Sequence, residues 1–369
     1  PRLLNTTNQE YIHGRKNTMT FEEFIMQARE MNASDIHLTV GAPTVVRVNG
    51  ELRKYTELSD QVVNRTILSI LSAEQEKALN EGKDIDFSFE LKNGARQRVN
   101  VFRQSGKLAA CIRLLNAEIP TLEELKMPSV LLDFAKKRRG LVLVTGPTGA
   151  GKSTTLAAMV EYINTTRPCH IITIEDPIEY RYKQEKATIH QRELGRDVPS
   201  FHEALRSALR EDPDVILIGE MRDYETISLA MTAAETGHLV FGTLHTSSAA
   251  QTVDRIIDAC PIHSQEQVRS QLASMIQAII AQSLIPRSDG KGRVAAVEVM
   301  VGTDAIKNLI RSNKINMMET TMAAGGRDGM CTLSDSLAKL YRSNQISYET
   351  ALEYATDRNE MEKKLLSGI

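Results

Sequence analysis

Two hydrophobic periods alternate in the first part of the chain. Over residues 21–29, apolar side chains recur every three or four positions, which predicts a short amphipathic helix. Residues 36–40 then alternate apolar with polar, and the valine-rich stretch 45–48 ends at an Asn-Gly pair at 49–50, a favoured hairpin turn. We therefore expect a helix followed by a hairpin of an antiparallel sheet.

A second helix and a second hairpin follow. Residues 61–79 are predicted to be helical, residues 85–91 alternate apolar with polar, and an Asn-Gly pair at 93–94 turns the chain back into a partner strand. These elements predict a small α+β domain. Its predicted boundaries are residues 19–115, with a linker over residues 116–121.

From residue 122 the pattern changes to short, wholly apolar runs separated by helix-length segments. Because such strands must be covered on both faces, they are typical of a parallel sheet between two layers of helices. After about residue 264 the pattern is mostly helical, with one strand at 293–300. We expect a doubly wound α/β domain over residues 122–369, with a helical C-terminal subdomain from about 264. The strand candidates before that point are residues 141–146, 170–174, 214–219 and 238–244.

The composition is that of an ordinary globular protein. The 369 residues are 41% hydrophobic and 25% charged, and 45 basic residues nearly balance 47 acidic ones. A net charge of -2 gives no single-sign field of the kind that attracts nucleic acid. We therefore expect no nucleic-acid partner.

The N-terminus and the cysteines bear on cellular location. Residues 1–18 are polar and begin with proline, so we interpret them as a mobile extension, native or added. No run approaches the roughly 18 apolar residues that cross a bilayer, and no signal-peptide core is present. The cysteines, at 111, 169, 260 and 331, lack the CxxC spacing of zinc and redox motifs. We expect a cytoplasmic protein with reduced thiols and no zinc.

The most specific chemistry lies in a glycine-rich motif. The sequence GPTGAGKS follows an apolar strand and precedes a helical stretch, which is the setting of a phosphate-binding loop. Glycines let successive backbone N–H groups point inward, and the helix N-terminus adds positive potential. We expect Lys152 to reach the β and γ phosphates of ATP and Ser153 to bind Mg²⁺. The candidate nucleotide-binding residues are Gly146, Pro147, Thr148, Gly149, Ala150, Gly151, Lys152, Ser153 and Thr154.

Two glutamates lie just past strand ends, where ligands bind in open α/β sheets. Glu220 follows the run DVILIG and is the candidate for holding Mg²⁺ through water. Glu175 follows HIITI and is the candidate for polarising the attacking water. The two roles are open to exchange, and either acid is open to a structural role as a helix cap. Asp214 begins its strand and should lie at the opposite edge.

Histidines bracket the last of these strands. His245 follows HLVFGTL at its carboxyl end, where a neutral imidazole is able to donate a hydrogen bond to a phosphate or to Glu220. His238 begins the same strand. A structural role is open for both, and more so for His238.

Four sequence boxes in order resemble the secretion ATPase superfamily of type II and type IV secretion, and most closely its pilus retraction branch, the PilT-like ATPases. They correspond to the Walker A, Asp, Walker B and His boxes of that superfamily. The boxes here are GPTGAGKSTTLAAM at 146–159, TIEDPIEY at 173–180, LREDPDVILIGEMRD at 209–223 and ETGHLVFGTLHT at 235–246. The helical segment AIKNLIR at 305–311 also resembles a motif tied to retraction. Its polar half differs from that motif, and the same apolar spacing is typical of an ordinary packing helix.

The resemblance implies a RecA-like P-loop NTPase motor domain behind a small PAS-like domain, assembled as a ring-shaped homohexamer. It further implies Mg-ATP hydrolysis coupled to pilus retraction, at the cytoplasmic face of the membrane against a pilus platform protein. In the superfamily, arginines from the N-terminal domain complete a neighbour's site, and the matching positions here are Arg98 and Arg113, with Arg96 and Arg103 in reserve. Each is equally open to a role as a solvated strand arginine.

Three rival functions follow from the same motifs. The extension and secretion branch typically carries a tetracysteine zinc element, which the cysteine spacing does not provide. An accessory role beside a second retraction ATPase paralogue is compatible with all four boxes. A DNA-translocating motor would favour a basic stripe with interleaved aromatics, which this sequence lacks.

Overall fold

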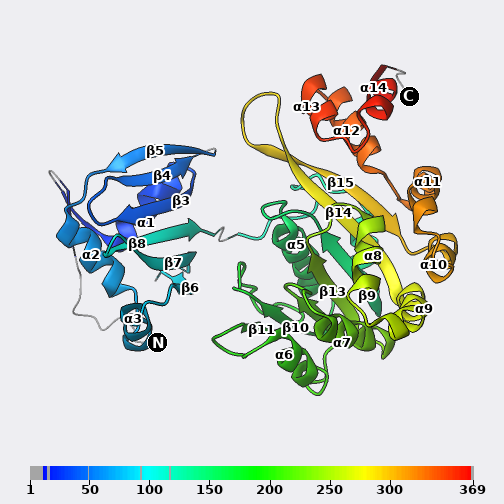
Figure 1. The fold of residues 1–369 in the computed structure, drawn as a ribbon, viewed down its shortest axis with the longest axis horizontal. Helices are drawn as coiled ribbons and strands as arrows, with labels where there is room; N and C mark the ends of the chain where they lie inside the picture. The colour runs from blue at the N-terminus through cyan, green and yellow to red at the C-terminus, as the bar shows by residue number, and fades with distance from the viewer. Residues whose placement is uncertain (1–10, 15–16, 49, 92–93, 116–117, 367–369) are drawn as a thin grey trace. The chain divides into compact units, whose positions relative to one another are not determined.

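The structure is a computed structural model that describes residues 11–14, 17–48, 50–91, 94–115 and 118–366. Two compact units divide the chain between Glu118 and Ile119 (Figure 1). That boundary falls inside the segment 116–121 for which the sequence predicts a linker, part of which lies outside the described residues.

The N-terminal unit is a six-stranded antiparallel sheet in the order β5-β4-β3-β8-β7-β6. Its helices bury Phe24 and Ile67 against Ile36 and Ile112 of the sheet. The strands are β3 (Ala33–Thr39), β4 (Thr44–Val48), β5 (Glu51–Thr56), β6 (Ile85–Glu90), β7 (Arg96–Gln104) and β8 (Lys107–Leu114). The helices are α1 (Phe21–Glu30), α2 (Asp60–Ser69) and α3 (Ala73–Asn80).

Two expectations for this unit need correction. The helix expected over 61–79 is broken, because Ser72 and Gln75 form a capping box that starts α3 as a separate helix. The extension expected over 1–18 contains β1 (Tyr11–Gly14), which pairs antiparallel with β2 (Asn17–Thr20). Residues 1–10 and 15–16, and Asn49 and Asn93 of the two predicted turns, lie outside the described residues.

The C-terminal unit contains a seven-stranded sheet in the order β11-β10-β12-β13-β9-β14-β15. All neighbouring pairs are parallel except β14 with β15. The strands are β9 (Gly140–Thr145), β10 (His170–Glu175), β11 (Thr188–Glu193), β12 (Val215–Ile218), β13 (Leu239–Leu244), β14 (Ile276–Pro286) and β15 (Arg293–Val301).

Helices cover both faces of this sheet, as the wholly apolar strands require. One face packs against α4 and α5, and the other against α6 to α11. These helices are α4 (Val130–Ala135), α5 (Lys152–Thr166), α6 (Phe201–Ala208), α7 (Tyr224–Glu235), α8 (Ala249–Asp258), α9 (Gln265–Met275), α10 (Asp304–Arg311) and α11 (Met318–Ala324). Three short 3₁₀ segments, η1 to η3, lie at Ile262–Ser264, Ile315–Met317 and Gly326–Asp328. The AIKNLIR segment forms α10 and buries Ile306 and Ile310.

In this unit the sequence pattern does not predict β11 or β14. β11 lies in the helix-length segment between two strand candidates, and β14 lies in the region predicted to be mostly helical from about residue 264. The apolar run of β14 has no alternation because the strand is buried on both faces, so its pattern does not distinguish it from a buried helix. The region predicted to be helical from about 264 begins with α9, is interrupted by the β14–β15 hairpin, and is helical again from Asp304.

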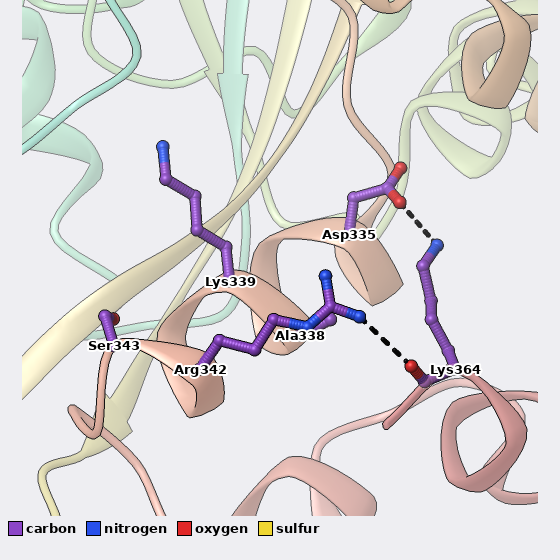
Figure 2. Close-up of a pocket in the computed structure, with 6 residues that line it drawn as sticks. All are labelled: Asp335, Ala338, Lys339, Arg342, Ser343 and Lys364. Atoms are coloured by element: carbon purple, nitrogen blue, oxygen red, sulfur yellow. Dashed lines mark hydrogen bonds and ion pairs between the residues drawn. The ribbon is translucent and has the colours of Figure 1, made fainter. Parts of the chain in front are cut away.

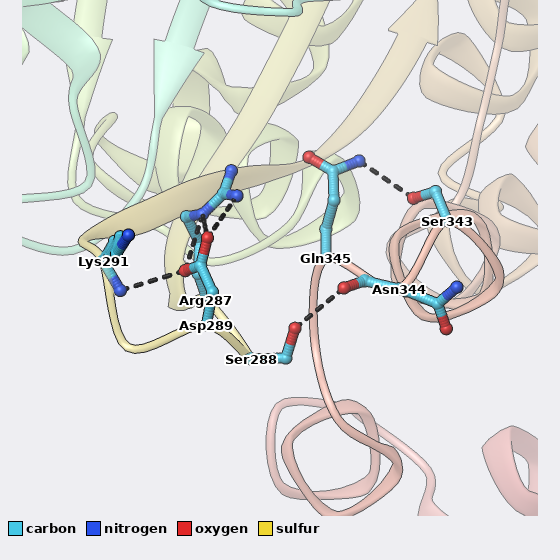
Figure 3. Close-up of polar contacts among 7 residues, drawn as sticks. All are labelled: Arg287, Ser288, Asp289, Lys291, Ser343, Asn344 and Gln345. Atoms are coloured by element: carbon cyan, nitrogen blue, oxygen red, sulfur yellow. Dashed lines mark hydrogen bonds and ion pairs between the residues drawn. The ribbon is translucent and has the colours of Figure 1, made fainter.

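The last helices, α12 (Leu333–Arg342), α13 (Tyr348–Glu353) and α14 (Arg358–Leu366), pack on the far end of the β14–β15 hairpin. Ser288 at the hairpin tip donates from its hydroxyl to Asn344 O (2.7 Å) and from its backbone N–H to Gln345 O (2.9 Å). Arg287 and Asp289 form a bidentate ion pair beside it (Figure 3). Within the described residues, none of the helices has the length and apolar character to cross a bilayer.

Candidate functional site

The predicted phosphate loop connects β9 to α5. Three of its glycines, Gly146, Gly149 and Gly151, have φ of +140°, +79° and +86°, a region that residues with a Cβ rarely enter. Among the described residues no side chain caps the first turn of α5, which leaves its N–H groups available to an anion. This backbone forms a concave anion site at a helix N-terminus.

The amine of Lys152 folds back onto this loop. It donates hydrogen bonds to Gly146 O (2.8 Å) and Pro147 O (3.1 Å). Burial lowers the pKa of the amine, and the nearby carboxylates of Glu220 and Glu179 oppose that shift. The ammonium thus contacts the loop carbonyls and is close enough to the two acids for their charges to act on it.

Glu220 lies at the carboxyl end of β12 and is held from two sides. Arg222 contacts both carboxylate oxygens (2.6 and 2.7 Å), and His245 Nε2 lies 2.9 Å from Oε1. Burial raises the pKa of Glu220, but the bonds and charges of Arg222 and His245 outweigh it and the pKa is lowered. The carboxylate is therefore ionised at neutral pH. The preceding residue, Gly219, accepts a hydrogen bond from the Thr243 hydroxyl on β13.

Glu175 ends β10, the neighbouring strand. Its Oε1 accepts hydrogen bonds from Thr173 Oγ1 (2.7 Å) and Gln191 Nε2 (3.2 Å). Burial raises its pKa from 4.5 to about 7, although these two bonds work against the rise. A carboxyl group with a pKa near neutrality is suited to accept a proton during a reaction.

The structure thus places Lys152, Glu175, Glu220 and His245 at one edge of the sheet, as the strand order predicts. Asp214 lies at the opposite edge, where its carboxylate accepts from His170 N (2.8 Å). His238 also lies there, and its Nδ1 contacts Ala233 O (2.9 Å) at the end of α7, which is a structural role.

The residues expected to hold Mg²⁺ fit that ion. Magnesium binds oxygen ligands and keeps several waters, so one hydroxyl and one or two carboxylates beside a phosphate suffice. Among the described residues the Ser153 hydroxyl has no hydrogen-bond partner, and the Glu220 carboxylate is ionised. These two groups would supply the oxygen donors for Mg²⁺, beside the positive charge of Lys152.

Comparison with known proteins identifies the family. The profile of the type II/IV secretion system protein family matches residues 15–368, almost the whole chain. The chain belongs to this family. The resemblance predicted from the four boxes is confirmed, and so is the fold class of an α/β motor domain behind a smaller N-terminal domain.

Individual members of the type II/IV secretion family give a finer comparison. The type IV pilus retraction ATPase PilT of Pseudomonas aeruginosa is 49% identical over 91% of this chain and 98% of its own length. The type IV pilus ATPase PilU of the same organism is 39% identical over 95% of this chain and 92% of its own. A crystal structure of the retraction motor PilT with bound ADP superposes with a TM-score of 0.86, at 47% identity over 93% of this chain and 99% of that one.

The two arginines that the family resemblance singles out are neighbours on the N-terminal sheet. Arg98 on β7 and Arg113 on β8 lie directly opposite each other in the strand register. Arg98 forms a bidentate pair with Asp86, and Arg113 Nε donates to the buried Asp35 (3.0 Å). Both side chains are substantially exposed, at 40% and 58%. Of the reserve residues, Arg96 is buried, and Arg103 donates to Asn80 Oδ1 (2.8 Å).

The sequence analysis did not predict three side chains that contact the candidate site residues. Arg222 lies two residues past Glu220, and a cation that close to a strand-end acid was a usable signal. Gln191 comes from β11 and Gln282 from β14, the two strands that the pattern did not reveal. Without those strands, no local signal pointed to either amide.

A cavity of about 630 Å³ lies elsewhere, among the C-terminal helices. Lys339, Arg342, Ser343 and Asp335 of the α12 region line it together with Lys364 of α14. Figure 2 shows Lys364 turned toward the Asp335 carboxylate, while Arg342 donates to Lys364 O (3.2 Å). No predicted site residue belongs to this cavity.

Proposed function

We propose that this chain is an ATPase that powers type IV pilus retraction and hence twitching motility. The observation that carries the proposal is the arrangement at one sheet edge: a phosphate loop, a lysine and two carboxylates with opposite pKa shifts. The alignment with PilT, which is 49% identical over 91% of this chain and 98% of its own length, supports pilus retraction as the use of that site.

ATP binds with its phosphates in the loop formed by residues 146–154. Backbone N–H groups of the loop and Lys152 hold the β and γ phosphates. Ser153, with Glu220 acting through water, would hold Mg²⁺, which neutralises phosphate charge when bound. Arg222 and His245 keep the Glu220 carboxylate ionised and fixed in place.

Glu175 acts as the general base in this proposal. It accepts a proton from water as the water oxygen bonds to the γ phosphorus, and the bond from that phosphorus to the bridging oxygen of ADP breaks. The products are ADP and inorganic phosphate. Its pKa of about 7 supports this assignment over the reverse, because Glu220 has a lowered pKa and is the poorer base.

A homohexameric ring completes the proposal. Arg98 and Arg113 of one protomer supply positive charge to the phosphates bound by the next, which gives the site a cation besides Lys152 and Mg²⁺. Their exposed guanidinium groups, anchored by Asp86 and Asp35, support that role. The ring works in the cytoplasm at the inner face of the membrane, against the pilus platform protein.

An accessory retraction paralogue is the second candidate. The 39% identity to PilU favours it less than the 49% identity to PilT favours a principal motor. The two differ in one measurable respect: a principal motor restores retraction in cells that lack every paralogue, whereas an accessory one does not.

ATP hydrolysis by the purified chain tests the activity. We expect Lys152→Ala to abolish turnover, because the phosphates lose their ammonium partner. Lys339→Ala, which removes an exposed lysine of α12, is the matched control and should keep the wild-type rate. Turnover by Lys152→Ala at the wild-type rate would show that this loop is not the catalytic site.

A further inference from the structure

We propose that Gln282, on strand β14, is a positioning residue that holds the phosphate loop in its anion-binding shape. The inference rests on the proposed function, because it takes the loop to be the ATP site. It concerns a residue that lies outside all four sequence boxes, more than a hundred positions from the loop.

The position of Gln282 follows from the strand register. β14 runs parallel to β9, and their last paired residues are Ala281 and Thr145. β9 ends there, whereas β14 continues for several residues. Gln282 is therefore level with Gly146, the first residue of the loop, and its side chain reaches the loop where β9 no longer forms sheet.

The amide of Gln282 joins the loop to the helix that follows it. Its Nε2 donates to Ala150 O (2.6 Å), and its Oε1 accepts from the Thr155 hydroxyl on α5 (2.8 Å). Gln282 is 4% exposed and Thr155 is 1% exposed, so water does not replace either bond. Because a carbonyl oxygen only accepts, the amide nitrogen must face Ala150, which fixes the orientation of the side chain.

β14 also explains two of the loop glycines. A Cβ on Gly146 would lie 2.1 Å from Gln282 O, and one on Gly151 would lie 2.8 Å from Gln282 Nε2. The backbone of β14 thus leaves no room for a side chain at Gly146, whereas at Gly151 a side chain would displace the Gln282 amide and would also be strained by the φ of +86°. The loop therefore supplies the groups that bind the anion, and Gln282 supports the loop from the side of β14.

Loss of the amide should weaken nucleotide binding more than it slows the chemical step. Gln282→Met keeps the length of the side chain but leaves Ala150 O buried without a donor. The free loop then gains alternative conformations, and binding must select the competent one. Nucleotide binding has to restore the conformation in which Ala150 O is buried without a donor, and that cost lowers the affinity roughly tenfold.

The test measures binding of a fluorescent ADP analogue, mant-ADP, together with ATPase kinetics. We expect Gln282→Met to weaken mant-ADP binding about tenfold and to raise KM by a similar factor, with a smaller change in kcat. Gln277→Met is the matched control: it removes an amide from the same strand at the opposite edge of the sheet, beside Gly140. That variant should bind mant-ADP as the wild type does.

Thr155→Val is the milder second variant, for use if Gln282→Met does not fold. It removes only the hydroxyl that anchors Gln282, and we expect a few-fold loss of mant-ADP affinity. The double variant should lose no more than Gln282→Met alone if Thr155 acts through Gln282. Wild-type affinity in either single variant overturns the inference. Failure of the unaltered protein to bind mant-ADP would instead overturn the proposed function.

Discussion

Acidification should slow the proposed motor through a single carboxyl group, that of Glu175. Burial raises its pKa to about 7, while the bonds from Thr173 and Gln191 limit the rise. A base with this pKa is about 90% ionised at pH 8 and about 10% ionised at pH 6. We therefore expect kcat/KM for ATP to fall roughly tenfold between these pH values.

The assay is steady-state ATP hydrolysis at constant ionic strength from pH 5.5 to 8.5. The parameter kcat/KM is the relevant one because it reports the ionisation of the enzyme before ATP binds, the state that the structure describes. Glu220 has a lowered pKa and stays ionised over this range, so it adds no second transition. A kcat/KM that is constant between pH 6 and pH 8 would refute the assignment of Glu175 as base.

The same group makes the stability of the protein depend on pH. The pKa of Glu175 is raised from 4.5 in the unfolded chain to about 7 in the folded one. Its favourable contribution is thus complete below pH 4.5 and is lost as the pH rises through 7, by about 3 kcal/mol in total. Glu175→Gln should abolish turnover and yet unfold at a higher temperature than the wild type at pH 8. A lower Tm for the variant would contradict this.

Three further predictions concern single residues. Gly146→Ala places a Cβ against Gln282 O, so mant-ADP binding should be lost in a fluorescence titration, and retained binding would contradict the packing. Arg222→Ala removes a cation that lowers the pKa of Glu220, so an NMR pH titration of that carboxyl should give a higher midpoint than in the wild type; an unshifted midpoint would contradict the pairing. Ile310→Ala in α10 should lower the unfolding free energy by about 2–5 kcal/mol in urea titrations, with KM unchanged.

The sequence predicted the features whose cause is local. Short-range patterns predicted the loop glycines, Lys152 and the acids at strand ends. The residue after a parallel strand lies at the carboxyl edge of the sheet, which is where ligands bind. β14 did not follow, because its apolar run reads equally as a helix, and its pairing with β9 joins residues more than a hundred positions apart. The missed strand concealed Gln282 and the packing reason for Gly146 and Gly151.

The sequence also did not determine which groups pair with the charged side chains of the site. His245 was expected near the γ phosphate or Glu220, and the structure places it on Glu220. The opposite pKa shifts of Glu175 and Glu220 depend on burial and on which partners face each carboxylate. Sequence position alone therefore left their roles interchangeable, whereas the surroundings of each group separate them.

Complementation of a strain that lacks this gene and its paralogues tests the central claim most directly. Surface pili and surface motility are scored with the wild-type chain and with Glu220→Ala. We predict that the wild type restores motility and normal pilus number, while Glu220→Ala leaves cells immobile with excess surface pili. Cells without pili in the Glu220→Ala strain, or normal motility, would contradict a retraction motor driven from this site.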